Sequence, residues 1–157
     1  MIDRPARDAA AQTLRSFISG KITNVAFEDL QPQTDDPAIH AIWDTCWIFY
    51  DDFKTHRLEG KNRLNLEQRK SCVRWIVFLH SDLEYSWPPI RQPGSDPNLR
   101  VSRGLWRSVF FGPFDLLPEE VSEFMSAGYY AVWPFNSVKD YKQAIRSPRM
   151  LAGIRAP

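Results

Sequence analysis

Apolar residues recur at helical spacing over two neighbouring stretches, and this periodicity constrains the fold more than any other feature of the chain. The first stretch opens with Asp36, a residue type that caps helices, and Pro37, which suits a first helical turn. Apolar residues then follow at intervals of three or one: Ile39, Ile42, Trp43, Cys46, Phe49, Tyr50 and Phe53. The pattern predicts one amphipathic helix over residues 36–53 with this face in the core.

The second stretch predicts a helix over residues 65–80, whose second half is apolar around most of its circumference. Further helices are expected over 5–19, after Thr23, over 118–128 and over 137–146, because each stretch carries a capping residue, an early proline or a glycine stop. Cys46 and Cys72 lie on apolar helix faces, which indicates buried structural cysteines.

The C-terminal half is less regular. Residues 87–118 are rich in proline and glycine, and within them 105–111 reads equally as a short helix or a strand. The aromatic run 129–135 predicts a strand that ends near Pro134. The expected fold class is therefore α+β, mainly α: a single globular domain over 1–157, with a helical core and a small aromatic strand or sheet in the C-terminal half.

Composition limits the class of protein. The 157 residues are 43% hydrophobic and 13% aromatic, which is enough apolar material to drive collapse into a folded domain. The formal net charge of +1 argues against a generally basic nucleic-acid binder. The sequence contains no apolar stretch that reads as a membrane span, and its beginning has no signal-peptide pattern. A cytoplasmic protein without membrane contact is expected.

Residues 14–28 read LRSFISGKITNVAFE and resemble the SHOCT-type helical hairpin, a short motif associated with oligomerisation. The resemblance covers about a tenth of the chain. It implies self-association and no catalysis. Ala26 stands where the family has an acidic residue before the phenylalanine.

A second resemblance covers most of residues 3–90. Residues 36–43 (DPAIHAIW), residues 50–58 (YDDFKTHRL) and the DLEY run that precedes Trp87 are similar to bacterial proteins of unknown function. The resemblance implies a bacterial origin and assigns no activity.

Charge is segregated along the chain. Between Glu28 and Asp52 there are seven acidic residues and no Lys or Arg, whereas between Lys54 and Arg74 there are seven basic residues against two acidic ones. We call these stretches the acidic block and the basic block. One interpretation is that two antiparallel helices neutralise each other's charges at their rims. The other is that the acidic block faces a partner.

The helical wheel favours a partner-binding face on the first stretch. His40, Asp44, Trp47 and Asp51 fall within about 60° of one another on an α-helix, and Asp52 follows. A tryptophan beside an acidic row is an unusual surface unless something covers it, either the rest of the domain or a basic protein partner that is steered by charge and anchored on an aromatic side chain. We therefore predict a non-enzymatic interaction protein, in its most concrete form an immunity protein that neutralises a toxin, with a partner-binding site of His40, Asp44, Trp47, Asp51 and Asp52.

An enzyme is the main alternative. His40 with Asp44, and Asp52 with His56, have a spacing that suits metal ligands, and His80, Asp82 and Glu84 are candidates for a third ligand or for catalysis. Neither pair forms a His-Glu-x-x-His motif, and the sequence has no phosphate-cradling glycine loop, Gly-x-Ser-x-Gly elbow or Cys-x-x-Cys. We expect no metal and no cofactor.

A nucleic-acid-binding module is the third alternative. It would use arginines interleaved with aromatic residues, since such side chains hold phosphates and stack on bases. The arginines are Arg91, Arg100, Arg103 and Arg107. The competing interpretation is that these arginines pack over a tryptophan-rich core.

Overall fold

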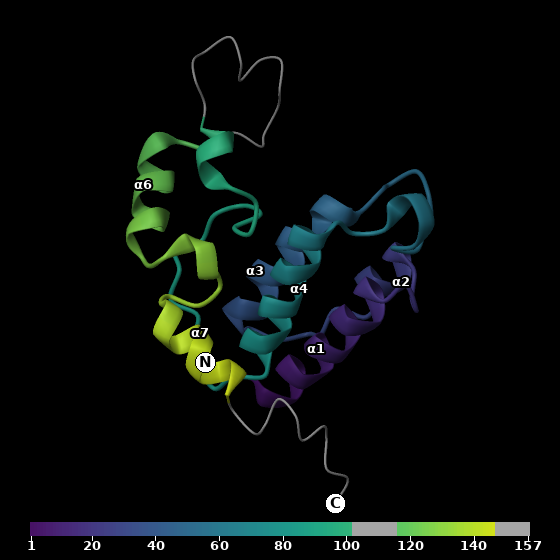
Figure 1. Ribbon diagram of the computed structural model, residues 1–157, viewed down its shortest axis with the longest axis horizontal. Helices are drawn as coiled ribbons and strands as arrows, with labels where there is room; N and C mark the ends of the chain where they lie inside the picture. The colour runs from purple at the N-terminus through teal and green to yellow at the C-terminus, as the bar shows by residue number, and fades with distance from the viewer. Residues whose placement is uncertain (102–115, 147–157) are drawn as a thin grey trace, which may run out of the picture.

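The computed structural model describes residues 1–101 and 116–146, and the regular elements of this part of the chain are helices (Figure 1). The α-helices are α1 (Arg4–Ile18), α2 (Asn24–Asp29), α3 (Pro37–Cys46), α4 (Leu66–Leu79), α6 (Pro118–Ser126) and α7 (Val138–Ile145). Short 3-10 helices are η1 (Trp47–Phe49), η2 (Gly60–Asn62), η3 (Pro97–Arg100) and η4 (Tyr130–Val132).

Local sequence determines where most α-helices begin. Side chains of Asp3, Thr23, Asp36, Asn65 and Ser137 each accept a backbone N–H in the first turn of the helix that follows. These contacts satisfy donors that have no partner within the helix. The helices expected over 5–19, after Thr23, over 65–80, over 118–128 and over 137–146 are confirmed to within a few residues at each end.

Helix α4 is the centre of the core. It lies beside α1 and also packs against α3 and α7 (Figure 1). Its second half, Trp75–Leu79, is buried at every position, as the all-round apolar pattern predicted. Cys46 and Cys72 are buried free thiols, and burial raises the pKa of Cys72 to about 12. The prediction of structural cysteines is confirmed.

A buried arginine joins α1, α3 and the end of α4. Arg7, 1% exposed, donates from Nε to Asp36 Oδ2 at 2.6 Å and from Nη2 to Asp36 Oδ1 at 3.1 Å. Its Nη1 donates to the carbonyl oxygen of Leu83 at 2.7 Å, and its guanidinium carbon lies 5.3 Å from the centre of the Phe78 ring. Arg4 adds hydrogen bonds to the carbonyl oxygens of Leu79 and Ser81 at 2.9 and 2.8 Å.

The helix predicted over 36–53 ends earlier, at Cys46. The chain continues through η1 into extended backbone at Tyr50, and the Asp51 side chain accepts the backbone N–H of Phe53 at 2.9 Å. Such a short-range bond competes with helical hydrogen bonding. Phe53, predicted to be in the core, is 95% exposed, so this part of the prediction is wrong.

The strand predicted over 129–135 is also wrong. This run forms η4 and a turn through the cis peptide Trp133–Pro134. The described residues form no strand, only an isolated bridge between Val101 and Leu116. The fold of the described ranges is therefore mainly helical, without the expected sheet. Residues 105–111 lie outside these ranges.

None of the helices in the described part of the chain has the length and apolarity needed to cross a membrane.

Candidate functional site

The early end of α3 places an aromatic pair at the surface. Trp47 caps α3, is 42% exposed, and has its ring centre 4.5 Å from that of Tyr50 at an angle of 59° between the planes. Trp47 and Tyr50 are three positions apart, a spacing that makes side chains neighbours on a helix. Here the helix has already ended, and Tyr50 has extended backbone. A large aromatic side chain is thus offered to solvent beside a second ring.

Carboxylates surround this pair. The Tyr50 hydroxyl donates to Glu28 Oε2 at 2.6 Å, which connects the end of α3 to α2. This hydrogen bond, together with desolvation and the nearby charges of Glu28, Asp52 and Asp29, raises the pKa of Tyr50 to about 12. The phenol therefore stays neutral and serves as a donor to the carboxylate at physiological pH.

A cavity of about 400 Å³ lies against the aromatic pair. Its lining residues come from α3, η1 and two later segments: Asp44, Trp47, Tyr50, Asp52, Arg91 and Gln92. We define the acidic–aromatic surface as Glu28, Asp44, Trp47, Tyr50 and Asp52.

Contacts with α3 hold the 91–94 segment in place. Asp44 accepts the backbone N–H of Gln92, and Thr45 Oγ1 accepts that of Gly94 at 3.0 Å. Gly94 is packed so closely that an added Cβ would lie 2.5 Å from Thr45 Cγ2 and 2.8 Å from the Trp133 ring. One wall of the cavity is therefore fixed by backbone contact with α3.

The structure brings together three of the five predicted site residues. Asp44, Trp47 and Asp52 line the cavity, whereas His40 is exposed at a distance from it along α3, with Nε2 2.7 Å from the Thr34 carbonyl oxygen. Asp51 lines a different cavity, because α3 ends before the helical position that would have aligned it with Asp44. Sequence reasoning missed Glu28 and assigned Tyr50 to the core, since their hydrogen bond joins residues 22 apart.

The acidic and basic blocks form no ion pairs with each other. Both lie wholly within the described residues, and no Lys or Arg nitrogen of the basic block is within 4.0 Å of a carboxylate oxygen of the acidic block. Asp36 is paired, but with Arg7 of α1. The charges of Glu28, Asp44 and Asp52 are consequently not compensated by ion pairs with the basic block.

The residues of the enzyme alternative do not form a metal site in the described part of the chain. Within residues 1–101 and 116–146, no group of three or more His, Cys, Asp or Glu side chains could hold a metal ion. His80 Nδ1 is 3.6 Å from Asp8, while Asp82 is 3.4 Å from Arg4. Burial lowers the pKa of His80, with the charge of Arg15 acting in the same direction. Asp82 thus forms an ion pair with the first residue of α1.

Of the arginines of the nucleic-acid alternative, the structure describes Arg91 and Arg100. Arg100 donates to the carbonyl oxygens of Arg91 and Gln92, the latter at 3.2 Å, and so packs along the wall of the cavity. Arg103 and Arg107 lie outside the described residues.

Comparison with known proteins gives no further guidance. No protein-family model matches the chain, and no curated protein or solved structure matches it.

Proposed function

We propose that this protein is a non-enzymatic interaction module that binds a basic protein partner through the acidic–aromatic surface. Its most concrete form is an immunity protein that neutralises a toxin. The proposal depends on one observation: a half-exposed tryptophan, in tilted ring contact with a tyrosine and surrounded by carboxylates that form no ion pair with the basic block.

The chemistry of this surface suits an arginine or lysine side chain. The exposed Trp47 ring offers a face to a cation, and a cation on a tryptophan face gains about 0.5–2 kcal/mol. Asp44 and Asp52 line the same cavity and outnumber Arg91. Aromatic anchors in partly enclosed pockets carry most of the binding energy in many protein interfaces. Glu28 and Asp29 beside them would speed the approach of a basic partner.

A capture experiment followed by titration tests the proposal. The wild-type chain and a Trp47→Ala/Asp52→Lys variant are used as baits in native lysate, and any protein recovered only by the wild type is purified and titrated by calorimetry. We expect the variant to bind at least about tenfold more weakly, which corresponds to about 1.4 kcal/mol. We also expect wild-type affinity to fall as salt increases.

A matched control separates a local effect from a change in net charge. Glu123→Lys makes the same charge change as Asp52→Lys. Glu123 is exposed on α6 and is not part of the acidic–aromatic surface. It should bind the partner like the wild type. Equal affinity of the wild type and the Trp47→Ala/Asp52→Lys variant would exclude the acidic–aromatic surface as the binding site.

A further inference from the structure

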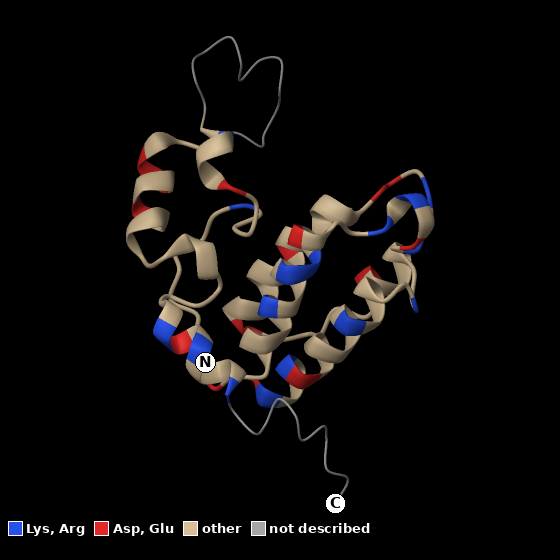
Figure 2. Ribbon diagram, viewed as in Figure 1, with Lys and Arg blue, Asp and Glu red and all other residues tan. Residues whose placement is uncertain are grey.

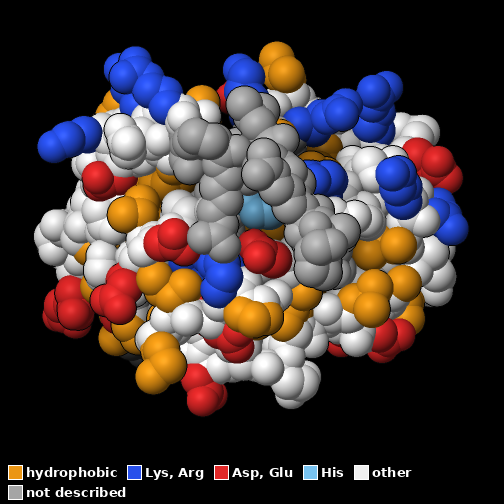
Figure 3. All heavy atoms as spheres, turned by 90° about the horizontal axis from the view of Figure 1, so that it is seen from below, with side chains coloured by type: hydrophobic (Ala, Val, Ile, Leu, Met, Phe, Trp, Pro, Cys, Tyr) orange, Lys and Arg blue, Asp and Glu red, His pale blue; other side chains and the backbone are white. Residues whose placement is uncertain are grey.

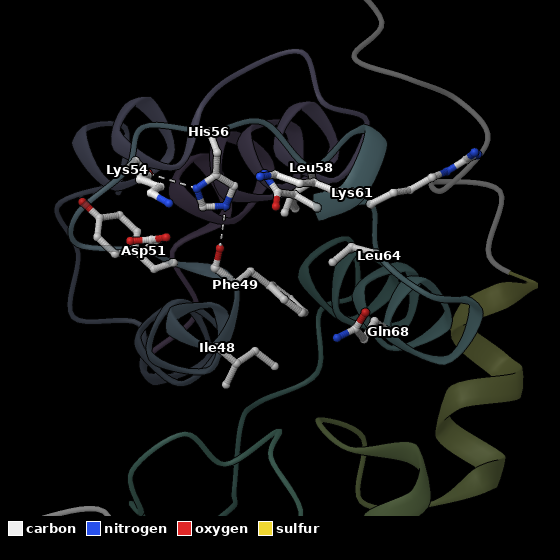
Figure 4. Close-up of a pocket in the computed structure, with 12 residues that line it drawn as sticks. Ile48, Phe49, Asp51, Lys54, His56, Leu58, Lys61, Leu64 and Gln68 are labelled. Atoms are coloured by element: carbon white, nitrogen blue, oxygen red, sulfur yellow. Dashed lines mark hydrogen bonds between the residues drawn. The ribbon is translucent and has the colours of Figure 1, made fainter.

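A second cavity lies on the other side of the segment that carries Trp47 and Tyr50. It has a volume of about 540 Å³ and lies between residues 48–64 and the first turn of α4 (Figure 4). Ile48 and Phe49 stand on one side, and Leu64 and Gln68 on the other, with His56 above them. This volume is in the range of pockets that bind small molecules.

Positive charge dominates this cavity. Lys54, Lys61 and Arg63 line it, and none of their nitrogens is within 4.0 Å of a carboxylate oxygen among the described residues. Asp51 is the acidic residue of the lining, and one of its oxygens already accepts the N–H of Phe53. Figure 2 shows the Lys and Arg residues of the loop that leads into α4. A lining with three basic residues and one acidic residue favours an anion.

The floor of the cavity is apolar. Phe49, Leu58 and Leu64 line it and are almost fully buried. Gln68 uses its carbonyl oxygen to accept the N–H of Asn65 at 2.9 Å, which fixes its amide at the edge of the cavity. A ligand that fits this lining combines an anionic group at the rim with an apolar body on the floor.

The wall that carries Lys54 is preorganised. The buried Asn24 donates from Nδ2 to the carbonyl oxygens of Asp51 and Lys54 at 3.2 and 3.1 Å, and its Oδ1 accepts the N–H of His56 at 2.8 Å. The two His56 ring nitrogens lie 3.1 Å from the carbonyl oxygens of Lys54 and Phe49. Since these contacts already order the loop, a ligand does not bear the cost of ordering it.

We infer that this cavity is a binding site for a small molecule that carries a phosphate group on an apolar or aromatic body. Lys54 and Arg63 hold the phosphate, because ammonium and guanidinium groups are the usual protein partners of phosphate oxygens. Phe49, Leu58 and Leu64 contact the body. The cavity shares Tyr50 with the acidic–aromatic surface, but the residues that hold the phosphate and its body do not belong to that surface, so the inference stands or fails independently of the proposed interaction function.

Three simple probes test separately whether the cavity binds the phosphate group and whether it binds the apolar body. 1-Naphthyl phosphate contains both chemical features, 1-naphthol has only the body, and inorganic phosphate has only the anion. We expect naphthyl phosphate to bind at least about tenfold more tightly than either of the others, and its affinity to fall at about 0.3 M salt. The measurement is ligand fluorescence, with calorimetry for phosphate.

Charge removal at the rim gives the decisive comparison. A Lys54→Gln/Arg63→Gln variant should lose about tenfold in affinity for naphthyl phosphate. The control Lys139→Gln/Lys142→Gln, which removes two exposed charges from α7, should retain wild-type affinity. Circular dichroism confirms that both variants are folded. In the wild type, amide resonances of residues 49–64 and Gln68 should shift on titration.

The inference would be overturned by no binding of naphthyl phosphate at millimolar concentration, by equal binding to the Lys54→Gln/Arg63→Gln variant, or by resonance shifts confined to other parts of the chain. Equal affinity for naphthyl phosphate and inorganic phosphate would also contradict it, because the apolar floor would then take no part.

Discussion

Arg7 is the side chain at which three helices meet, and apolar periodicity does not predict its burial. Its charge is balanced by Asp36, and its remaining donors reach the carbonyl oxygens that follow α4. Burial by itself would raise the pKa of Asp36, but the hydrogen bond and charge of Arg7, with backbone donors, outweigh it and lower the pKa. The carboxylate thus stays ionised and its stabilising contribution is lost only as the pH falls below its ordinary value of 3.8.

Removing one member of this pair leaves the other charge buried. We expect Arg7→Ala to lower the free energy of unfolding by about 3–5 kcal/mol, since an uncompensated buried carboxylate costs that much. Urea denaturation at pH 7 measures it. Arg15→Ala, on the exposed side of the same helix, is the control and should change stability by less than about 0.5 kcal/mol. Similar losses in the two variants would show that the pair is not a major source of stability.

His80 gives the protein a separate dependence on pH. Because burial and Arg15 lower its pKa, the unfolded chain binds a proton at a pH where the folded chain does not. Stability should therefore fall as the pH drops through the ordinary histidine value of 6.5, and be fully present above it. Unfolding free energies between about pH 7 and pH 5 should decline less steeply for His80→Gln than for the wild type. An unchanged slope would contradict this assignment.

At the scale of elements, caps and apolar periodicity were sufficient to predict five of the helices, because both signals lie within a few residues of the helix they define. The two failures have different causes: α3 ends early beside a short-range bond from Phe53 to Asp51, whereas the cause at 129–135 is non-local. In 129–135, Arg74 Nε donates to the Trp133 carbonyl oxygen at 2.7 Å and Trp87 Nε1 to that of Pro134 at 3.0 Å. Side chains 59 and 47 residues away thus satisfy this backbone without a neighbouring strand.

In the candidate site too, the sequence predicts neighbours within one helix and misses contacts between separate segments. Asp44 and Trp47 were predicted correctly as neighbours because they share one face of α3 and its first following turn. Asp51 was misplaced because the helical wheel was continued past Cys46. The contact of Tyr50 with Glu28, and the wall formed by Arg91 and Gln92, depend on how separate segments pack, which spacing along the chain does not encode.

The end of α3 at Cys46 leads to a sharp contrast between two phenylalanines. Phe49 is buried against Trp75, with ring centres 6.4 Å apart, whereas Phe53 is 95% exposed. We expect Phe49→Ala to cost about 3–5 kcal/mol in unfolding free energy, and Phe53→Ala less than about 0.5 kcal/mol. Chemical denaturation of the two variants measures the difference. A large loss for Phe53→Ala would contradict the exposed position of its side chain.

Over the whole molecule, charge and burial are unevenly distributed. Seen from below, most Lys and Arg side chains gather toward one rim of the face, and most Asp and Glu side chains lie away from it (Figure 3). A net charge of +1 therefore conceals surfaces of opposite sign. Burial is uneven too: α4 buries six of its residues, whereas α6 buries only Val121 and Phe124.

This uneven burial predicts the order in which the helices open. Amide hydrogen exchange should occur in Trp75–Leu79 of α4 only through global unfolding, and in α6 through a partial opening at lower free energy, because fewer apolar side chains oppose that opening. Exchange measured by NMR across a range of urea concentrations distinguishes the two. Equal protection of α6 and α4 would indicate one cooperative unit.

The arginines of α1 also have a consequence for synthesis on the ribosome. Arg4 and Arg7 bind carbonyl oxygens of Leu79, Ser81 and Leu83, which lie 75 to 77 positions further along the chain. Helix α1 therefore leaves the exit tunnel several seconds before these carbonyl oxygens do, since translation supplies about 5–20 residues per second. Until residues 79–83 emerge, Arg4 and Arg7 have their carboxylate partners Asp8 and Asp36 but not these carbonyl oxygens, and a nascent chain paused before that point exposes the apolar face of α1 to chaperones.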